Sequence, residues 1–375
     1  MATQLPAHLH FEPSWGVSYG RGLWLVALRE SPERPTNGYS RKKTMHRAPL
    51  SSALRSHAFA AAIALVGLAF IAAPTSIYAA APQVRTQAPG YYRVILGDFE
   101  VTALNDGTLG LDVAKLLKEP EAKTNAALMK SFVAAPLDTS VNAFLINTGT
   151  RLVLIDTGGG TLFGPTLGKL IKNLQAAGYQ PDQVDDILVT HLHPDHVGGL
   201  MLNGTMMFPN ATVHADQHDI DYWLSQANLD KAPADSKGFF QGAMASMTPY
   251  ISAGKFKPLD ASGDAEVVPG IHAIASPGHT AGHTSYVVES KGQKLIVIGD
   301  LIHVASVQLA DPEVTVAFDS DAKSAAASRK KVFSLAASEG DLIGSAHLQF
   351  PGLGHLRAAG KSWQWVPVNY VTELH

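Results

Sequence analysis

The chain has 375 residues, of which 46% are hydrophobic and 16% are charged, and this composition excludes an intrinsically disordered or fibrous protein. The formal net charge of −3 argues against nucleic acid as a partner. The chain has 16 histidines and no cysteine, which excludes thiol nucleophiles and disulfides, so that a metal site would use imidazole and carboxylate ligands.

Residues 1–80 differ from the rest of the chain. They carry eight basic and three acidic residues, and their apolar run over 58–73 is followed by small residues. This pattern predicts a secretory signal peptide over residues 45–80, and hence a periplasmic or secreted protein with no membrane span after cleavage. A membrane anchor is the alternative, although the run is shorter than the roughly 20 residues of a span. Residues 1–44 are interpreted as a non-native or unstructured upstream extension, with a genuine N-terminal segment as the alternative, and residues 81–375 as one domain.

Short apolar runs predict buried strands that lead into polar residues. The runs and the residues that follow them are 151–155 and Asp156, 187–190 and His191, 294–298 and Asp300, and 342–343 and His347. Polar side chains gathered at strand ends are typical of the site of a layered α/β enzyme.

Helical patterns lie between these runs. Pro165 is expected to open a helix whose apolar residues recur at helical spacing until Gly178. A second helix is expected around residues 215–226, and a third, capped by Ser320, through Ala337. The alternation of strands and helices indicates the α/β class.

The most specific motif is His191-Leu-His193-Pro-Asp195-His196. Two histidines two residues apart at a strand end can face one metal ion, and Asp195 and His196, after the turn at Pro194, can face a second ion. A single tetrahedral ion does not need four ligands packed so closely beside an open position, whereas a two-metal site does. A histidine-rich surface turn is the alternative interpretation.

With this motif the chain resembles the metallo-β-lactamase superfamily, whose signature is His-x-His-x-Asp-His. Further stretches match that family in order, namely residues 155–158 (IDTG), 277–283 (PGHTAGH), 299–300 (GD) and 346–347 (AH). The resemblance covers nearly all of residues 81–375. It implies an α/β fold, the four-layer αβ/βα sandwich of that family.

The resemblance also implies a ligand set and a mechanism. One ion would be held by His191, His193 and His279, and the second by Asp195, His196 and His347, with Asp300 bridging both and with Asp156 and His283 supporting the ligands from behind. The cofactors would be two divalent ions, Zn²⁺ first, with Mn²⁺, Co²⁺ and Fe²⁺ as alternatives. A hydroxide between the ions would be the nucleophile, and Asp300 and Asp195 are assigned as catalytic residues.

A finer resemblance is to methyl parathion hydrolases and their lactonase relatives, in stretches such as residues 163–167 (FGPTL) and 237–240 (KGFF). The residues that this resemblance places in the substrate pocket are Phe163, Trp223, Phe239, Leu116, His303 and Phe318. The three aromatic residues Phe163, Trp223 and Phe239 suit a flat aryl group, with ordinary core packing as the alternative. The other three depart from methyl parathion hydrolases, which carry Arg in place of Leu116 and Leu in place of His303 and Phe318.

The expected function is an exported metal-dependent hydrolase that cleaves lactones and aryl esters of the dihydrocoumarin type, with organophosphate triesters as a side activity. The three differences from methyl parathion hydrolases, at Leu116, His303 and Phe318, argue against efficient phosphotriester hydrolysis. Methyl parathion hydrolase-type cleavage as the main activity is the alternative, and a β-lactamase, a glyoxalase-type thioesterase and a non-enzymatic metal-binding protein are further rivals. The expected partner is a small-molecule substrate, and a homodimer is the default assembly.

Two other polar pairs receive no catalytic role. Asp185 and Asp186 are expected to lie in a solvated turn before a strand. His214 and His218 have the spacing of a zinc-protease helix but lack its adjacent glutamate, so we expect a surface or packing pair.

Overall fold

The structure is a computed structural model that describes residues 81–263 and 265–374. The extension expected over residues 1–44 and the signal peptide expected over residues 45–80 lie outside these described residues. The fold set out below is that of the compact unit that begins at residue 87. Among the described residues, no helix is long and apolar enough to cross a membrane.

The first of two large sheets has the strand order β1-β2-β3-β4-β5-β8-β9. Its strands are β1 (Tyr91–Leu96), β2 (Phe99–Leu111), β3 (Leu137–Asn147), β4 (Leu152–Ile155), β5 (Asp186–Leu188), β8 (Thr212–Asp216) and β9 (Phe256–Leu259). Neighbours are antiparallel from β1 to β4 and parallel from β4 to β9. The carboxyl ends of β4 and β5, which lead into Asp156 and His191, therefore lie at the same end of the sheet.

The second sheet has the order β10-β11-β12-β13-β14-β15-β16. Its strands are β10 (Ala265–Val268), β11 (Ile271–Ala275), β12 (Thr284–Ser290), β13 (Gln293–Val297), β14 (Leu342–Gly344), β15 (Leu353–Ala359) and β16 (Ser362–Pro367), and a separate small hairpin is formed by β6 (Met201–Leu202) and β7 (Thr205–Met206). Only β13 and β14 are parallel neighbours among the described strands of this sheet. Asp300 after β13 and His347 after β14 therefore also lie at one end.

A buried apolar core joins the two sheets. Val153 and Ile155 of β4 pack in this core against the second sheet, whereas Leu152 and Leu154 pack in another core on the opposite face. Both faces of β4 are therefore buried, which explains why its sequence is a continuous apolar run without alternation.

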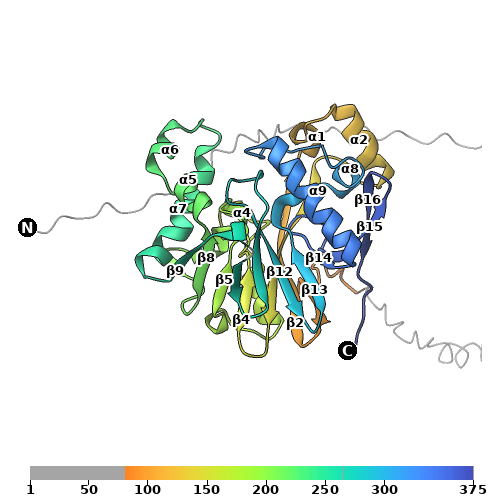
Figure 1. Cartoon of the computed structure of the whole chain (residues 1–375). Helices are drawn as coiled ribbons and strands as arrows, with labels where there is room; N and C mark the ends of the chain where they lie inside the picture. Colours follow the sequence, from red (N-terminus) through yellow and green to blue (C-terminus); the bar gives the residue numbers. More distant parts are fainter. Residues whose placement is uncertain (1–80, 264, 375) are drawn as a thin grey trace, which may run out of the picture. The chain divides into compact units, whose positions relative to one another are not determined.

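Helices cover the outer faces of the sheets. In Figure 1, α9 and the group α5 to α7 lie on opposite sides of the paired sheets, and each has its own apolar core against the neighbouring sheet. The helices are α1 (Val113–Leu116), α2 (Glu121–Lys130), α3 (Leu170–Ala176), α4 (Pro194–Val197), α5 (Gln217–Trp223), α6 (Gln226–Lys231), α7 (Lys237–Ser252), α8 (Ala305–Gln308) and α9 (Ala322–Glu339). The layers helix, sheet, sheet and helix confirm the predicted α/β class and four-layer αβ/βα sandwich.

Helix α3 begins later than the sequence pattern predicts. Pro165 does not open it, because Gly168 has a φ of +79°, which a right-handed helix cannot accommodate. The buried Asp106 carboxylate accepts the N–H groups of Gly168 (3.0 Å) and Leu170 (2.9 Å). This long-range contact sets the helix start at Leu170.

The other two predicted helices are confirmed with altered ends. The one expected around residues 215–226 is α5, which is shorter at both ends. The long helix α9 is capped by Asp321, which accepts the N–H of Ser324, and not by Ser320.

The prediction of a solvated turn is wrong for Asp186. This residue is buried at the start of β5, where Oδ1 lies 3.0 Å from Nε2 of His214 and Oδ2 accepts from Nε of Arg151 at 3.1 Å. The two partners compensate the burial of the charge. His214 is thus a packing residue, while the exposed His218 pairs with Asp216.

Candidate metal centre

Residues from both sheets meet at the ends of their strands and form a first group of potential metal ligands. Their ligand atoms lie within 4.8 Å of one another, and all four side chains are buried. The group comprises His191 and His193 after β5, His279 between β11 and β12, and Asp300 after β13. These are the three histidines that the sequence predicts for one ion, together with the predicted bridging aspartate.

A second group lies beside the first. Asp195 and His196 on α4 and His347 after β14 bring their ligand atoms within 4.8 Å of one another. Asp300 faces both groups, because its Oδ1 is 3.1 Å from Nε2 of His196 and 3.1 Å from Nε2 of His347, and its Oδ2 is 3.2 Å from Nε2 of His279. The structure therefore brings all seven predicted ligands together.

The chemistry of these atoms fits two divalent cations. Among the described residues, Nε2 of His191, Nε2 of His196 and Oδ1 of Asp300 are buried and make no hydrogen bond of acceptable geometry, although the last two atoms lie only 3.1 Å apart. A buried polar atom without a partner is costly, and a bound cation would supply the missing interaction. Imidazole and carboxylate donors suit Zn²⁺ and neighbouring divalent metals.

Asp156 supports the second group from behind. Its Oδ2 lies 2.9 Å from Nδ1 of His196, and its two oxygens accept the N–H and the hydroxyl of Thr190, both at 2.8 Å. Its φ of +62° is a left-handed conformation that aspartate tolerates better than most residues. The contact orients the His196 ring so that Nε2 faces Asp300, which agrees with the supporting position expected from the sequence.

Further contacts fix the other rings. His283, also expected to support the ligands, accepts the backbone N–H of Asp300 at Nε2 (3.0 Å). Nδ1 of His347 donates to the backbone oxygen of Ser140 (2.9 Å), and Nδ1 of His279 lies 2.8 Å from Oδ1 of Asp319. Asp319 lies outside every sequence motif and stands just before a predicted helix, so the sequence does not single it out.

Burial and neighbouring charges shift the pKa values of the site in opposite directions. Burial lowers the pKa of His191 and His193 well below the usual value of histidine, because an imidazolium is poorly solvated there. Burial acts in the same direction on His279, but the carboxylates of Asp300 and Asp319 outweigh it and raise the pKa to about 9. Burial raises the pKa of Asp300, yet the surrounding imidazoles lower it well below the usual range. Asp300 is therefore held as a carboxylate.

Aromatic side chains stand beside the first group. The rings of Trp223 and Phe239 lie 5.0 Å and 4.8 Å from the His193 ring, and Phe318 lies 6.1 Å from Phe239, measured between ring centroids. Phe163 follows β4 and lies against Gly159, where a Cβ atom would come within 3.1 Å of its ring. We call Trp223, Phe239 and Phe318 the aromatic wall.

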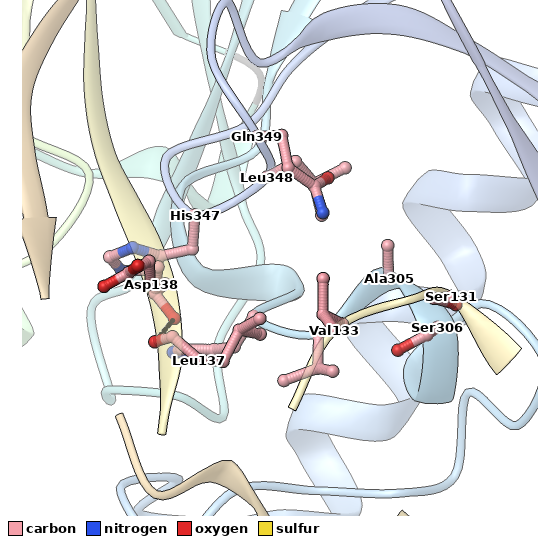
Figure 2. A pocket seen from close by; sticks show the side chains of 12 residues that line it. Ser131, Val133, Leu137, Asp138, Ala305, Ser306, His347, Leu348 and Gln349 are labelled. Carbon is pink, nitrogen blue, oxygen red and sulfur yellow. Dashed lines mark hydrogen bonds between the residues drawn. The ribbon is translucent and has the colours of Figure 1, made fainter. Parts of the chain in front are cut away.

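A cavity of about 90 Å³ lies next to the second group (Figure 2). It is lined by His303 and His347 and by apolar side chains that include Val133 and Leu137. Of the six predicted pocket residues, His303 lines this cavity. Leu116, on α1, packs against the apolar cluster formed by residues of α1, α2 and α8, as Phe318 also does.

His303 also approaches the predicted ligands. Its Nε2 is 3.2 Å from Oδ2 of Asp300, and its ring stacks on that of His347 with centroids 5.0 Å apart. Together with Asp300 and His347 it forms a third group of potential ligand atoms.

Comparison with known proteins gives the family. Residues 137–347 of this chain match the metallo-beta-lactamase superfamily. An N-acyl homoserine lactonase of a Bacillus species is 28% identical over 176 residues, which are 41% of this chain and 60% of that protein. The corresponding lactonase of Bacillus thuringiensis is 27% identical over 183 residues, 43% of this chain and 64% of that protein. The matched part thus spans less than two thirds of these lactonases.

Two solved structures are similar over a larger part. The hydrolase AbOPH, of the beta lactamase superfamily, is 38% identical with a TM-score of 0.72, and the match covers 76% of this chain and 100% of that one. AidC, a dizinc quorum-quenching lactonase in complex with a product, is 27% identical with a TM-score of 0.70, covering 76% of this chain and 99% of that one. From the fold, the two ligand groups and these similarities it follows that the chain belongs to the metallo-beta-lactamase superfamily and carries a His/Asp cluster of potential metal ligands.

Proposed function

We propose that the protein is a dinuclear metal-dependent hydrolase of lactones and aryl esters, including dihydrocoumarin-type substrates, with organophosphate triester hydrolysis as a side activity. The observation that carries this proposal is the pair of ligand groups that share Asp300, with the aromatic wall beside His193 and the cavity beside His347. The lactonase relatives support a cyclic ester as the substrate class.

The seven predicted ligands would hold the two ions in the two groups described above. When bound, such ions polarise a carbonyl or phosphoryl oxygen and lower the pKa of a coordinated water molecule. Asp300 is held ionised by the surrounding imidazoles, so its carboxylate would offset part of the positive charge of the two ions.

The chain's other residues would bind and orient the substrate. Trp223, which is buried in the core, and Phe239, which packs against that core, place aromatic rings beside His193, an environment that suits an aryl ring or another flat apolar group. The apolar side of the cavity, with Val133 and Leu137, suits an aliphatic part of the substrate. Both surfaces exclude water from the reacting ester, which strengthens polar interactions at the centre.

We also propose export of the protein, with residues 45–80 as a signal peptide and residues 81–375 as the mature domain. The signal peptide is supported by the basic residues of that segment, by its apolar run and by the small residues that follow the run. A homodimer is proposed on symmetry statistics and on the family resemblance. N-terminal sequencing of protein recovered from the periplasm tests the cleavage site near Ala79 or Ala80, and sedimentation equilibrium tests the dimer.

The substrate class is tested by kcat/KM of the metal-loaded protein for dihydrocoumarin, an N-acyl homoserine lactone and methyl parathion. The proposal expects a value for at least one lactone well above that for methyl parathion. The opposite order would make the protein primarily an organophosphate hydrolase, and no turnover of either lactone with two ions bound would refute the proposal. His193→Ala should abolish activity, and His218→Ala, which removes a histidine whose side chain is 71% exposed, is the matched control.

A further inference from the structure

Asp219, on α5, is a buried carboxylate that belongs to neither ligand group. Its Oδ2 accepts the N–H of Leu192 (3.0 Å) and the hydroxyl of Thr280 (2.9 Å), and its Oδ1 accepts the N–H of Gly282 (2.6 Å). The residue is 1% exposed, and burial raises its pKa to about 6. Three donors are the compensation that a buried carboxylate requires.

The three donors come from two different segments that carry ligands. Leu192 stands between the two histidines of the segment after β5, which continues the first sheet. Thr280 and Gly282 follow His279 directly, between β11 and β12 of the second sheet. The Asp219 carboxylate therefore connects the ligand-bearing segments of both sheets. The backbone also connects them directly, because the N–H of Thr284 donates to the backbone oxygen of Thr190 (2.8 Å).

The backbone at Gly282 packs closely against Asp219. A Cβ atom at position 282 would lie 2.7 Å from the backbone nitrogen of Asp219 and 2.9 Å from its Oδ1. Such distances are far below van der Waals contact, so only glycine permits this approach. The segment after His279 is thus pressed against α5 where Asp219 receives its hydrogen bonds.

The separation of the two segments matters for the centre. Nδ1 of His193 and Nε2 of His279 lie 3.0 Å apart, and both must reach the same ion. Sites of this kind need their side chains within about 0.5 Å of the productive position. We propose that Asp219 is a positioning residue that holds the segments of His193 and His279 at the separation required by the first metal group.

This proposal rests on the two-ion site of the proposed function. A carboxylate presents acceptors to all three donors, whereas an amide would turn its NH₂ group against at least one of them. Asp219→Asn should therefore displace one segment relative to the other. We expect one of the two Zn²⁺ dissociation constants to rise about 10–100-fold, the range seen when groups behind a metal ligand are lost, and the other to stay unchanged.

The experiment is a Zn²⁺ titration of the full-length, metal-free protein against a chromophoric chelator. The step weakened in Asp219→Asn should be the step that His279→Ala removes. Asp186→Asn is the matched control, because it alters a buried carboxylate that contacts neither segment. It should lower the melting temperature and leave both dissociation constants as in the wild type.

A second variant keeps the test decisive if Asp219→Asn does not fold. Thr280→Val deletes one donor and keeps the shape of the side chain, and the loss of one hydrogen bond should weaken the same step by about three- to tenfold. Unchanged dissociation constants, or equal weakening of both, would overturn the positioning role. A wild-type protein that binds fewer than two ions would instead contradict the proposed function. The role of Asp219 would then still be tested by comparing, in Asp219→Asn and the wild type, the Zn²⁺ dissociation constant of the step that His279→Ala removes.

Discussion

The Nδ1 atom of His279 lies 2.8 Å from Oδ1 of Asp319, forty positions further along the chain. This contact determines which ring nitrogen faces the centre, since Nε2 then points to Oδ2 of Asp300 at 3.2 Å. The other Asp319 oxygen accepts the N–H of Val316 (3.0 Å). A carboxylate that is itself held in place thus orients a predicted metal ligand.

Replacement of Asp319 by alanine should weaken metal binding. The His279 ring would lose its orienting partner, and we expect the Zn²⁺ affinity to fall about 10–100-fold, measured by competition with a chelator. Asp311→Ala removes an exposed carboxylate that is paired with Lys123 and serves as the control. Equal affinities in the two variants would show that Asp319 has no part in metal binding.

Trp223→Leu should change substrate binding more than metal binding. The substitution removes an aromatic face beside His193, so kcat/KM for an aryl lactone should fall by about tenfold, mainly through KM. Turnover of an aliphatic lactone should change less. Tyr370→Leu, at an aromatic residue that is 79% exposed, should leave both substrates unaffected. An equal loss for aryl and aliphatic lactones would contradict the role of the wall.

His303→Leu should shift the substrate preference. The imidazole fills space next to Asp300 and His347 and carries an unpaired Nδ1 atom. Leucine would make this side of the centre apolar, and we expect the ratio of methyl parathion to dihydrocoumarin turnover to rise about tenfold. An unchanged ratio at full metal content would remove His303 from the specificity determinants.

Acid should destabilise the metal-free protein in part through His283. Burial, aided by the charge of His279, lowers the pKa of His283 from 6.5 to about 3. Below pH 6.5 His283 binds a proton in the unfolded chain but not in the folded chain. The contribution of neutral His283 to the free energy of unfolding is therefore fully present above pH 6.5 and is lost as the pH falls toward 3.

The measurement is the free energy of unfolding of the metal-free wild type and of His283→Asn, by denaturant titration at pH 7.5 and pH 5.0. Because the variant lacks this titration, the stability advantage of the wild type should shrink by ~2 kcal/mol at the lower pH. An advantage that is the same at both pH values would contradict the buried neutral imidazole.

Much of the fold could be predicted because the strands that carry the site have unambiguous sequences. The run before Asp156 and the run before Asp300 are each buried on both faces of their sheet, so their short apolar patterns are uninterrupted. The short spacing of His191, His193, Asp195 and His196 likewise fixes their proximity locally.

The remaining features depend on contacts between distant parts of the chain. The start of α3 is set by Asp106, more than sixty residues earlier, and the burial of Asp186 depends on Arg151 and His214. Asp319 reaches His279 only after the chain has passed through two further strands. No local pattern encodes such pairings, so the sequence could not reveal them.

The central claim, hydrolysis by a two-ion centre bridged by Asp300, is tested most directly by adding Zn²⁺ to the metal-free protein while dihydrocoumarin hydrolysis is followed. We predict that activity rises until two equivalents are bound and that Asp300→Ala is inactive at any Zn²⁺ concentration. Full activity at one equivalent, or hydrolysis that survives in Asp300→Ala, would contradict the claim.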